Sequence, residues 1–222
     1  MNPIIALVWK DLSIELRTRE LVTSMSLVAF LSLVILGLAA RSTPPAASGI
    51  TPAALWVTVA FAATLGLARA HALDHEREAL QGLLLTPVSR SALFVAKWAS
   101  NLILVLVLEA AVLLASTALI DPGIGRRASV LALPLALGAV GFTATGTLLG
   151  AMTVTTRLRE VLLPILLLPL ALPVIIVSVA AIARALEGAG VAALAGPLKM
   201  LAAYDVVFAA LGVWLFAHVV EE

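Results

Sequence analysis

The amino-acid sequence predicts an all-α membrane protein with several spanning helices, and two observations support this fold class. The 222 residues are 62% hydrophobic and only 12% charged, and their mean hydropathy is +1.13. A soluble domain normally carries about 25% charged residues. The apolar residues also form continuous runs that reach the ~20 residues needed to cross a bilayer as a helix. Continuous runs exclude a membrane barrel, because the strands of a barrel alternate apolar and polar residues.

Six runs reach the required length, so we expect a single domain over residues 1–222, with six spanning helices joined by short loops. The first run follows a charged segment of 20 residues, which argues against a cleaved signal peptide. The expected spans are Leu21–Ala40, Pro52–Arg69, Leu93–Leu119, Ser129–Thr153, Glu160–Ala183 and Leu198–Val219.

The distribution of basic residues predicts the orientation of these spans. With the N-terminus inside, nine basic residues lie on the cytoplasmic side: Lys10, Arg17, Arg19, Arg69, Arg77, Arg90, Lys97, Arg157 and Arg159. Five lie on the outer side: Arg41, Arg126, Arg127, Arg184 and Lys199. This excess favours both termini in the cytoplasm. The formal net charge of +1 leaves no basic surface for nucleic acid.

Residues 1–20 have the pattern of an amphipathic helix that lies in the membrane interface. One helical face is apolar and includes a tryptophan, and its members are Ile5, Val8, Trp9, Leu12 and Leu16. The rest of the circumference holds Lys10, Asp11, Glu15, Arg17 and Thr18. This pattern favours an interfacial helix with Trp9 at headgroup depth over a cytoplasmic extension of the first span.

A charged segment, residues 72–90, separates the second and third apolar runs and is the most informative stretch of the chain. Its front half predicts an amphipathic helix, with Leu73, Leu80, Leu83 and Leu84 on one side and Asp74, His75, Glu78 and Gln81 on the other. Thr86-Pro87 ends this helix, because proline lacks the N–H and crowds the preceding turn. A short helix beside the entry of the next span is suited to receive a push from a soluble partner.

The sequence has no motif of a soluble enzyme, so we expect no catalytic residue and no metal site. It has no Gly-x-x-x-x-Gly-Lys-Ser/Thr loop for nucleotide phosphates, no His-Glu-x-x-His and no Gly-x-Ser-x-Gly. Without cysteine, neither disulfides nor the usual zinc clusters can form. If the protein uses nucleotide energy, another subunit must supply it.

Two features inside the expected spans are candidates for function. Glu109 follows Lys97 by twelve residues, or ~18 Å along a helix, which places its carboxyl near mid-bilayer. We expect it to face the protein interior, as a functional group or as a packing group that hydrogen-bonds a neighbouring helix. Pro164, Pro169 and Pro173 each remove a helical hydrogen bond. They predict a kinked or locally unwound helix, either as a hinge or as tolerated kinks.

Two further patterns concern packing and haem ligation. Gly146 and Gly150 form a small-xxx-small surface for close helix contact. This surface serves a dimer seam or, as we favour, a contact within one subunit. His71, His75 and His218 lie near the inner ends of their spans, where histidines usually meet water or headgroups. We therefore do not expect them to ligate haem, although imidazole is a good iron ligand.

Three segments of the chain resemble exporter-type ABC permeases of the second family. Within that group the chain is similar to the haem exporter protein B (CcmB) family of cytochrome c maturation systems. The resemblance rests on LQGLLLTPVSRSALFVAKWASN (Leu80–Asn101) with Glu109 after it, on RLREVLLPILLLPLALPVII (Arg157–Ile176) and on LVWKDLSIELRTRE (Leu7–Glu20). It covers nearly the whole chain. The sequence departs from the pattern at Glu78, commonly glycine, and at Gln81, commonly an acid.

The resemblance implies a permease subunit, as a homodimer in the bacterial inner membrane, that couples ATP hydrolysis to haem export or to release of a haem-loaded chaperone. ATP and Mg would bind to a separate cytoplasmic subunit, haem would be the cargo, and other partners would be haem-handling membrane proteins and the chaperone. The residues expected to contact the ATP-binding subunit are Glu76, Arg77, Glu78, Leu80, Gln81, Leu84, Pro87 and Arg90. Alternatives are an exporter permease for lipid, drug or polysaccharide, and a nontransporting membrane scaffold.

Overall fold

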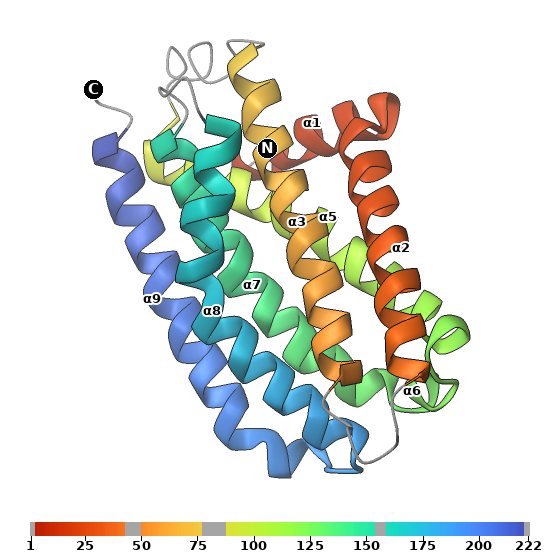
Figure 1. Ribbon diagram of the computed structural model, residues 1–222. Helices are drawn as coiled ribbons and strands as arrows, with labels where there is room; N and C mark the ends of the chain where they lie inside the picture. Colours follow the sequence, from red (N-terminus) through yellow and green to blue (C-terminus); the bar gives the residue numbers. More distant parts are fainter. Residues whose placement is uncertain (1–2, 43–49, 77–87, 154–158, 220–222) are drawn as a thin grey trace.

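The computed structural model describes residues 3–42, 50–76, 88–153 and 159–219, and within these ranges the chain folds into helices without a strand (Figure 1). This confirms the predicted all-α class. The helices are α1 (Pro3–Thr18), α2 (Glu20–Arg41), α3 (Ile50–Glu76), α5 (Arg90–Leu119), α6 (Gly123–Arg126), α7 (Ala128–Thr153), α8 (Arg159–Leu186), the 3₁₀ turn η2 (Val191–Leu194) and α9 (Ala195–Val219).

Six of these helices are long and apolar enough to cross a membrane, as predicted: α2, α3, α5, α7, α8 and α9. Their ends extend beyond the predicted spans. In particular, α3 continues through Glu76, so residues 72–76 belong to its end. The reason is local, because the stretch from Ala70 to Glu76 contains neither glycine nor proline to end a helix. The rest of the predicted coupling helix, residues 77–87, lies outside the described residues.

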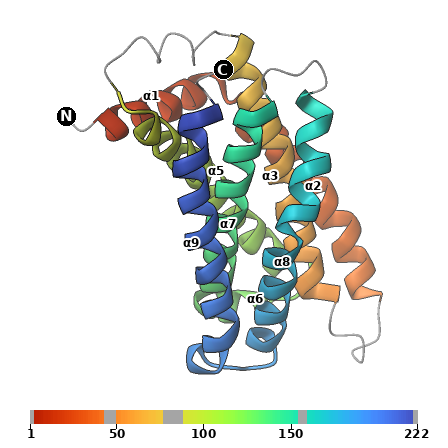
Figure 2. The ribbon, with the colours of Figure 1, turned by 90° about the vertical axis from the view of Figure 1, so that its left-hand side faces the viewer.

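The spanning helices form a bundle with two distinct ends (Figures 1 and 2). We call them the α1 end, where α1 lies across the bundle, and the α6 end, where the short helix α6 joins α5 to α7. Asp121 shapes the turn before α6, because its Oδ1 accepts the Gly123 N–H at 2.8 Å. The Gly/Ala-rich stretch between α8 and α9 contains η2 at the same end, where Gly188 adopts a left-handed backbone with φ of 105°.

A sharp corner separates α1 from α2, so α1 is not a straight extension of the first span. Arg19 adopts the left-handed conformation between the two helices, with φ 53° and ψ 23°. Glu15 caps the new helix, because its Oε1 accepts the Val22 N–H at 2.8 Å. The apolar side chains of Ile5, Trp9 and Leu16 stay 60%, 68% and 73% exposed. These three side chains belong to the apolar face that the sequence assigned to the membrane interface, whereas Val8 and Leu12 of that face are half-buried.

Helix α7 lies at the centre of the packing, against α3, α5, α8 and α9. Four of its glycines each lie beneath side chains of a neighbouring helix, where a Cβ atom would overlap them. Gly138 lies beneath Trp56 of α3 and Ser178 of α8, and Gly141 beneath Tyr204 and Asp205 of α9. The side chains of Leu67 and His71, one turn apart on α3, contact Gly146 and Gly150 respectively. The small-xxx-small surface therefore serves contact within one subunit, as we favoured.

The three prolines of α8 do not interrupt the helix, which continues from Arg159 to Leu186. Of the two forms expected, local unwinding is therefore wrong. Pro169 and Pro173 lie on the exposed side of α8, away from the buried row formed by Leu163, Leu167, Ala171 and Val174. A proline on the outer side leaves the packed side intact, which explains how the helix tolerates it. The hinge role remains a prediction.

The Gly150 contact generates the first prediction. Gly150→Ala should destabilise the protein by about 1–3 kcal/mol, because the new methyl group overlaps the His71 ring in a packed core. The measurement is the melting temperature of the purified chain in detergent. Gly190→Ala is the control, since Gly190 has an extended backbone and, apart from its two chain neighbours, nothing lies within 4 Å of a Cβ atom there. Equal melting temperatures for the two variants would contradict the packing, and adding His71→Ala should restore the stability of Gly150→Ala.

Candidate functional site

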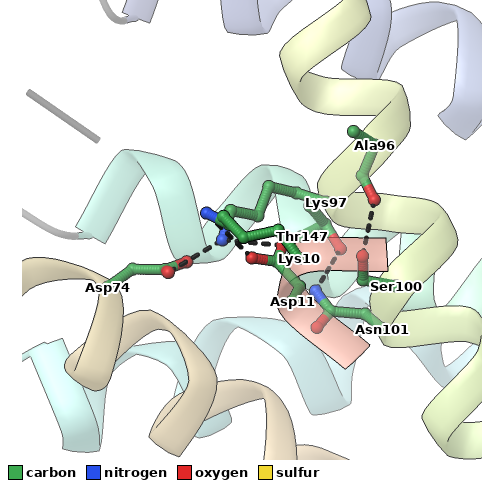
Figure 3. Close-up of polar contacts among 8 residues, drawn as sticks. All are labelled: Lys10, Asp11, Asp74, Ala96, Lys97, Ser100, Asn101 and Thr147. Atoms are coloured by element: carbon green, nitrogen blue, oxygen red, sulfur yellow. Dashed lines mark hydrogen bonds and ion pairs between the residues drawn. The ribbon is translucent and has the colours of Figure 1, made fainter. Parts of the chain in front are cut away.

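A buried ion cluster at the α1 end joins three helices (Figure 3). The Nζ atom of Lys97 in α5 lies 3.0 Å from Oδ2 of Asp11 in α1 and 2.8 Å from Oδ1 of Asp74 in α3. The Lys97 side chain is 11% exposed, and those of Asp11 and Asp74 are 17% and 21% exposed. Lys10 adds a second cation to Asp11 at 3.0 Å. We call Lys97, Asp11 and Asp74 the ion cluster.

The ion cluster continues along α5 as a polar row. Asn101, one turn after Lys97, donates through Nδ2 to Oγ1 of Thr147 in α7 at 3.0 Å (Figure 3). The Ser100 hydroxyl donates to the Ala96 carbonyl oxygen at 2.9 Å, so this hydrogen bond stays within α5. Trp98 donates through Nε1 to Oγ1 of Thr143 at 3.1 Å. These bonds fix α5 against α7 and so fix where Lys97 lies.

The ion cluster lies close to both ends of the charged segment of residues 72–90. Asp74 is two residues before the end of α3 at Glu76, and Lys97 is seven residues after the start of α5 at Arg90. Ser89 caps α5, because its Oγ accepts the Ala92 N–H at 3.3 Å. The ion cluster thus ties together the two helices that flank residues 77–87, and it attaches α1 to both.

The predicted contact residues divide into two groups. Glu76 and Arg90 are the terminal residues of α3 and α5. The other six lie outside the residues that the structure describes: Arg77, Glu78, Leu80, Gln81, Leu84 and Pro87. The structure therefore places Glu76 and Arg90, which lie on either side of the other six residues, at one end of the bundle.

A narrow cleft of about 70 Å³ opens beside the ion cluster, between α1, α3 and α5. Its polar lining includes Glu15, His71 and Asn101 together with the ion cluster. Nε2 of His71 has no hydrogen-bond partner among the described residues. The described residues contain no group of three or more histidines, aspartates or glutamates arranged to hold a metal ion. A second ion pair, between Arg69 of α3 and Glu20 of α2, lies at the same end.

Glu109 lies inside the bundle, as expected, with only 4% of its surface exposed. Its Oε1 has no hydrogen-bond partner within the described part of the chain. A second buried acid, Asp205 of α9, is 6% exposed and packs against Gly141. Beside it, the Tyr204 hydroxyl donates to the Leu170 carbonyl oxygen of α8 at 3.0 Å and lies 3.0 Å from Oγ1 of Thr145. Two spans therefore each place a carboxyl group within the apolar core.

Neither the ion cluster nor Asp205 was predicted from the sequence. The sequence places Asp11, Asp74 and Lys97 near one membrane surface, but it does not show which helices are neighbours. For Asp205 a signal was present, because it is an acid within an apolar run, the same feature that drew attention to Glu109.

The fold and the site define an all-α, multi-pass membrane protein with an ion cluster at one end of its bundle. A family model described as CcmB protein matches residues 2–222, and the chain belongs to this family. A search of curated proteins found no match. Family membership supports a haem-exporter ABC permease of cytochrome c maturation, a transporter membrane subunit that works with an ATP-binding subunit.

The second prediction tests the ion cluster. Lys97→Met should lower the free energy of unfolding by about 3 kcal/mol, because it leaves the largely buried Asp74 carboxylate without its cation and leaves Asp11 with Lys10 alone. Denaturant titration of the purified chain in mixed micelles measures this change, and Lys199→Met on the exposed side of α9 is the matched control. In a double-mutant cycle, Asp74→Asn and Lys97→Met together should cost less than the sum of the single changes. Strict additivity would show that the two side chains do not interact.

Proposed function

We propose that this permease couples ATP hydrolysis on a separate cytoplasmic subunit to haem export or to release of a haem-loaded chaperone, and that residues 76–90 receive the force. The proposal rests on family membership and on the position of the ion cluster. A force that the ATP-binding subunit exerts on this segment acts on the end of α3 and on the start of α5, and the ion pair of Asp74 with Lys97 holds these two helices together. Through Asp11 the same force reaches α1.

The orientation in this proposal has the α1 end in the cytoplasm. The excess of basic residues on that side supports it. A soluble ATP-binding subunit then has direct access to residues 76–90. Arg77, Glu78 and Arg90 are proposed to bind it through charge-assisted hydrogen bonds.

The wider assembly is also part of the proposal. A second copy of this chain, haem-handling membrane proteins and the haem chaperone are the expected partners, as family resemblance implies. Native mass spectrometry of the complex purified from membranes tests the stoichiometry, and a complex with one copy of this chain would contradict the homodimer. Binding of nucleotide is assigned to the partner, since the sequence has no phosphate-binding loop of the Gly-x-x-x-x-Gly-Lys type.

The third prediction separates docking from coupling. In complexes reconstituted with the ATP-binding subunit, Arg77→Glu combined with Glu78→Arg should weaken subunit association while membrane insertion stays normal. Asp11→Asn should leave association intact but reduce the stimulation of ATPase activity several-fold, because α1 loses its ion pair to α5. Co-purification and ATP turnover measure the two effects.

The control for this experiment is Lys199→Met, an exposed cation outside the proposed contact surface. Cytochrome c maturation in cells should fall with the loss of coupling. Normal co-purification and normal ATPase stimulation in both test variants would rule out residues 76–90 as the docking element.

The fourth prediction tests the orientation. The chain lacks cysteine, so single cysteines can be introduced without background. Ser129→Cys at the α6 end should react with an impermeant thiol reagent added to the outer face of the membrane. Thr18→Cys at the α1 end should react only after the membrane is opened. The reverse pattern of labelling would overturn the orientation.

A further inference from the structure

A second cleft, of about 470 Å³, opens at the α6 end, far from the ion cluster. Two consecutive arginines of the α6–α7 junction line it, Arg126 and Arg127, together with Thr51 at the start of α3 and Leu186 at the end of α8. The cleft therefore lies where three spans begin or end.

Arg127 is held in place by the backbone of another helix. Its Nη1 donates to the Ala185 carbonyl oxygen of α8 at 3.0 Å, and the side chain is half-buried. A guanidinium carries five N–H donors in a planar fork. No ion pair joins Arg126 or Arg127 to a carboxylate of the described residues. Asp121 also lines the cleft, and its Oδ1 accepts the Gly123 N–H, so the lining holds two arginines and one carboxylate and keeps an excess of positive charge.

The level at which the cleft lies relative to the bilayer indicates which kind of ligand it can bind. Leu119 and Leu186 are the last residues of α5 and α8, and Thr51 is the second residue of α3. The ends of spanning helices lie at the level of the polar headgroups of a bilayer. The anionic group most abundant at that level is the lipid phosphate, and arginine binds phosphate with two parallel N–H···O bonds.

We propose that this cleft binds the phosphate of an anionic lipid headgroup, with Arg126 and Arg127 as its donors. The bound phosphate would link the α6–α7 junction to the end of α8, because Arg127 already contacts Ala185. The proposal is independent of ATP coupling, which was assigned to the opposite end of the bundle. A free phosphate ion presents the same oxygen atoms, so the experiment must distinguish the two sources.

The experiment uses the full chain, purified in detergent and examined by native mass spectrometry. Phosphatidylglycerol should bind the unmodified protein at least about tenfold more tightly than it binds Arg126→Gln/Arg127→Gln, because two charge-assisted contacts are lost. Arg184→Gln is the matched control, an exposed arginine at the same end of the bundle that does not line the cleft. This control should retain the lipid, and phosphatidylcholine should bind weakly to every variant.

Four results would overturn the proposal. Equal loss of lipid from Arg184→Gln would show general attraction to positive charge, and equal binding of phosphatidylcholine would show that the negative charge is irrelevant. Displacement of the lipid by millimolar inorganic phosphate would show a site for free phosphate. If the double variant does not fold, the single change Arg126→Gln serves instead. This side chain is exposed, so its loss should weaken lipid binding without affecting folding. Unchanged lipid binding in a folded Arg126→Gln protein would also overturn the proposal.

Discussion

The close approach of helices to α7 is the constraint on which the rest of the bundle depends. In a membrane, helices gain little from apolar burial against each other, so contact distance and hydrogen bonding determine which helices pair. Glycines along α7 provide the short distances to α3, α8 and α9. Threonines of the same helix provide hydrogen bonds to α5 and α9, through Thr147, Thr143 and Thr145. Helix α7 thus contacts three neighbouring helices through its glycines and forms hydrogen bonds to two helices through its threonines.

The ion cluster follows from this packing. His71 lies against Gly150, and Asp74 comes three residues later on α3, so the contact with α7 determines where the Asp74 carboxylate lies. Asn101 is bonded to α7 as well, which determines where Lys97 lies one turn earlier on α5. The two charges meet at 2.8 Å because both of their helices are positioned against the same third helix.

Much of the fold could be predicted from the sequence, because the bilayer imposes length and composition on each span. The six spans, the separate N-terminal helix and the buried position of Glu109 are examples, and the span ends agree within three residues except that of α3, which continues seven residues further. The ion cluster could not be predicted, since its members are 63 and 23 residues apart along the chain and meet only through helix packing. The prolines of α8 predicted a kinked or locally unwound helix, because a sequence pattern does not show that Pro169 and Pro173 lie on the outward side, where a continuous helix tolerates them.

The corner at Arg19 leaves α1 with an unusual division of its surface. Its acidic side chains, Asp11 and Glu15, turn toward the bundle, while Ile5, Trp9 and Leu16 turn outward. With that outward face immersed in the bilayer, movement along the membrane normal would pull three large apolar side chains into water. Sideways movement keeps them in lipid, but it breaks the ion pair of Asp11 with Lys97 and removes Leu7 from the buried cluster that includes Phe94. The helix is therefore held in the membrane interface by its outward face and against the bundle by Asp11 and Leu7.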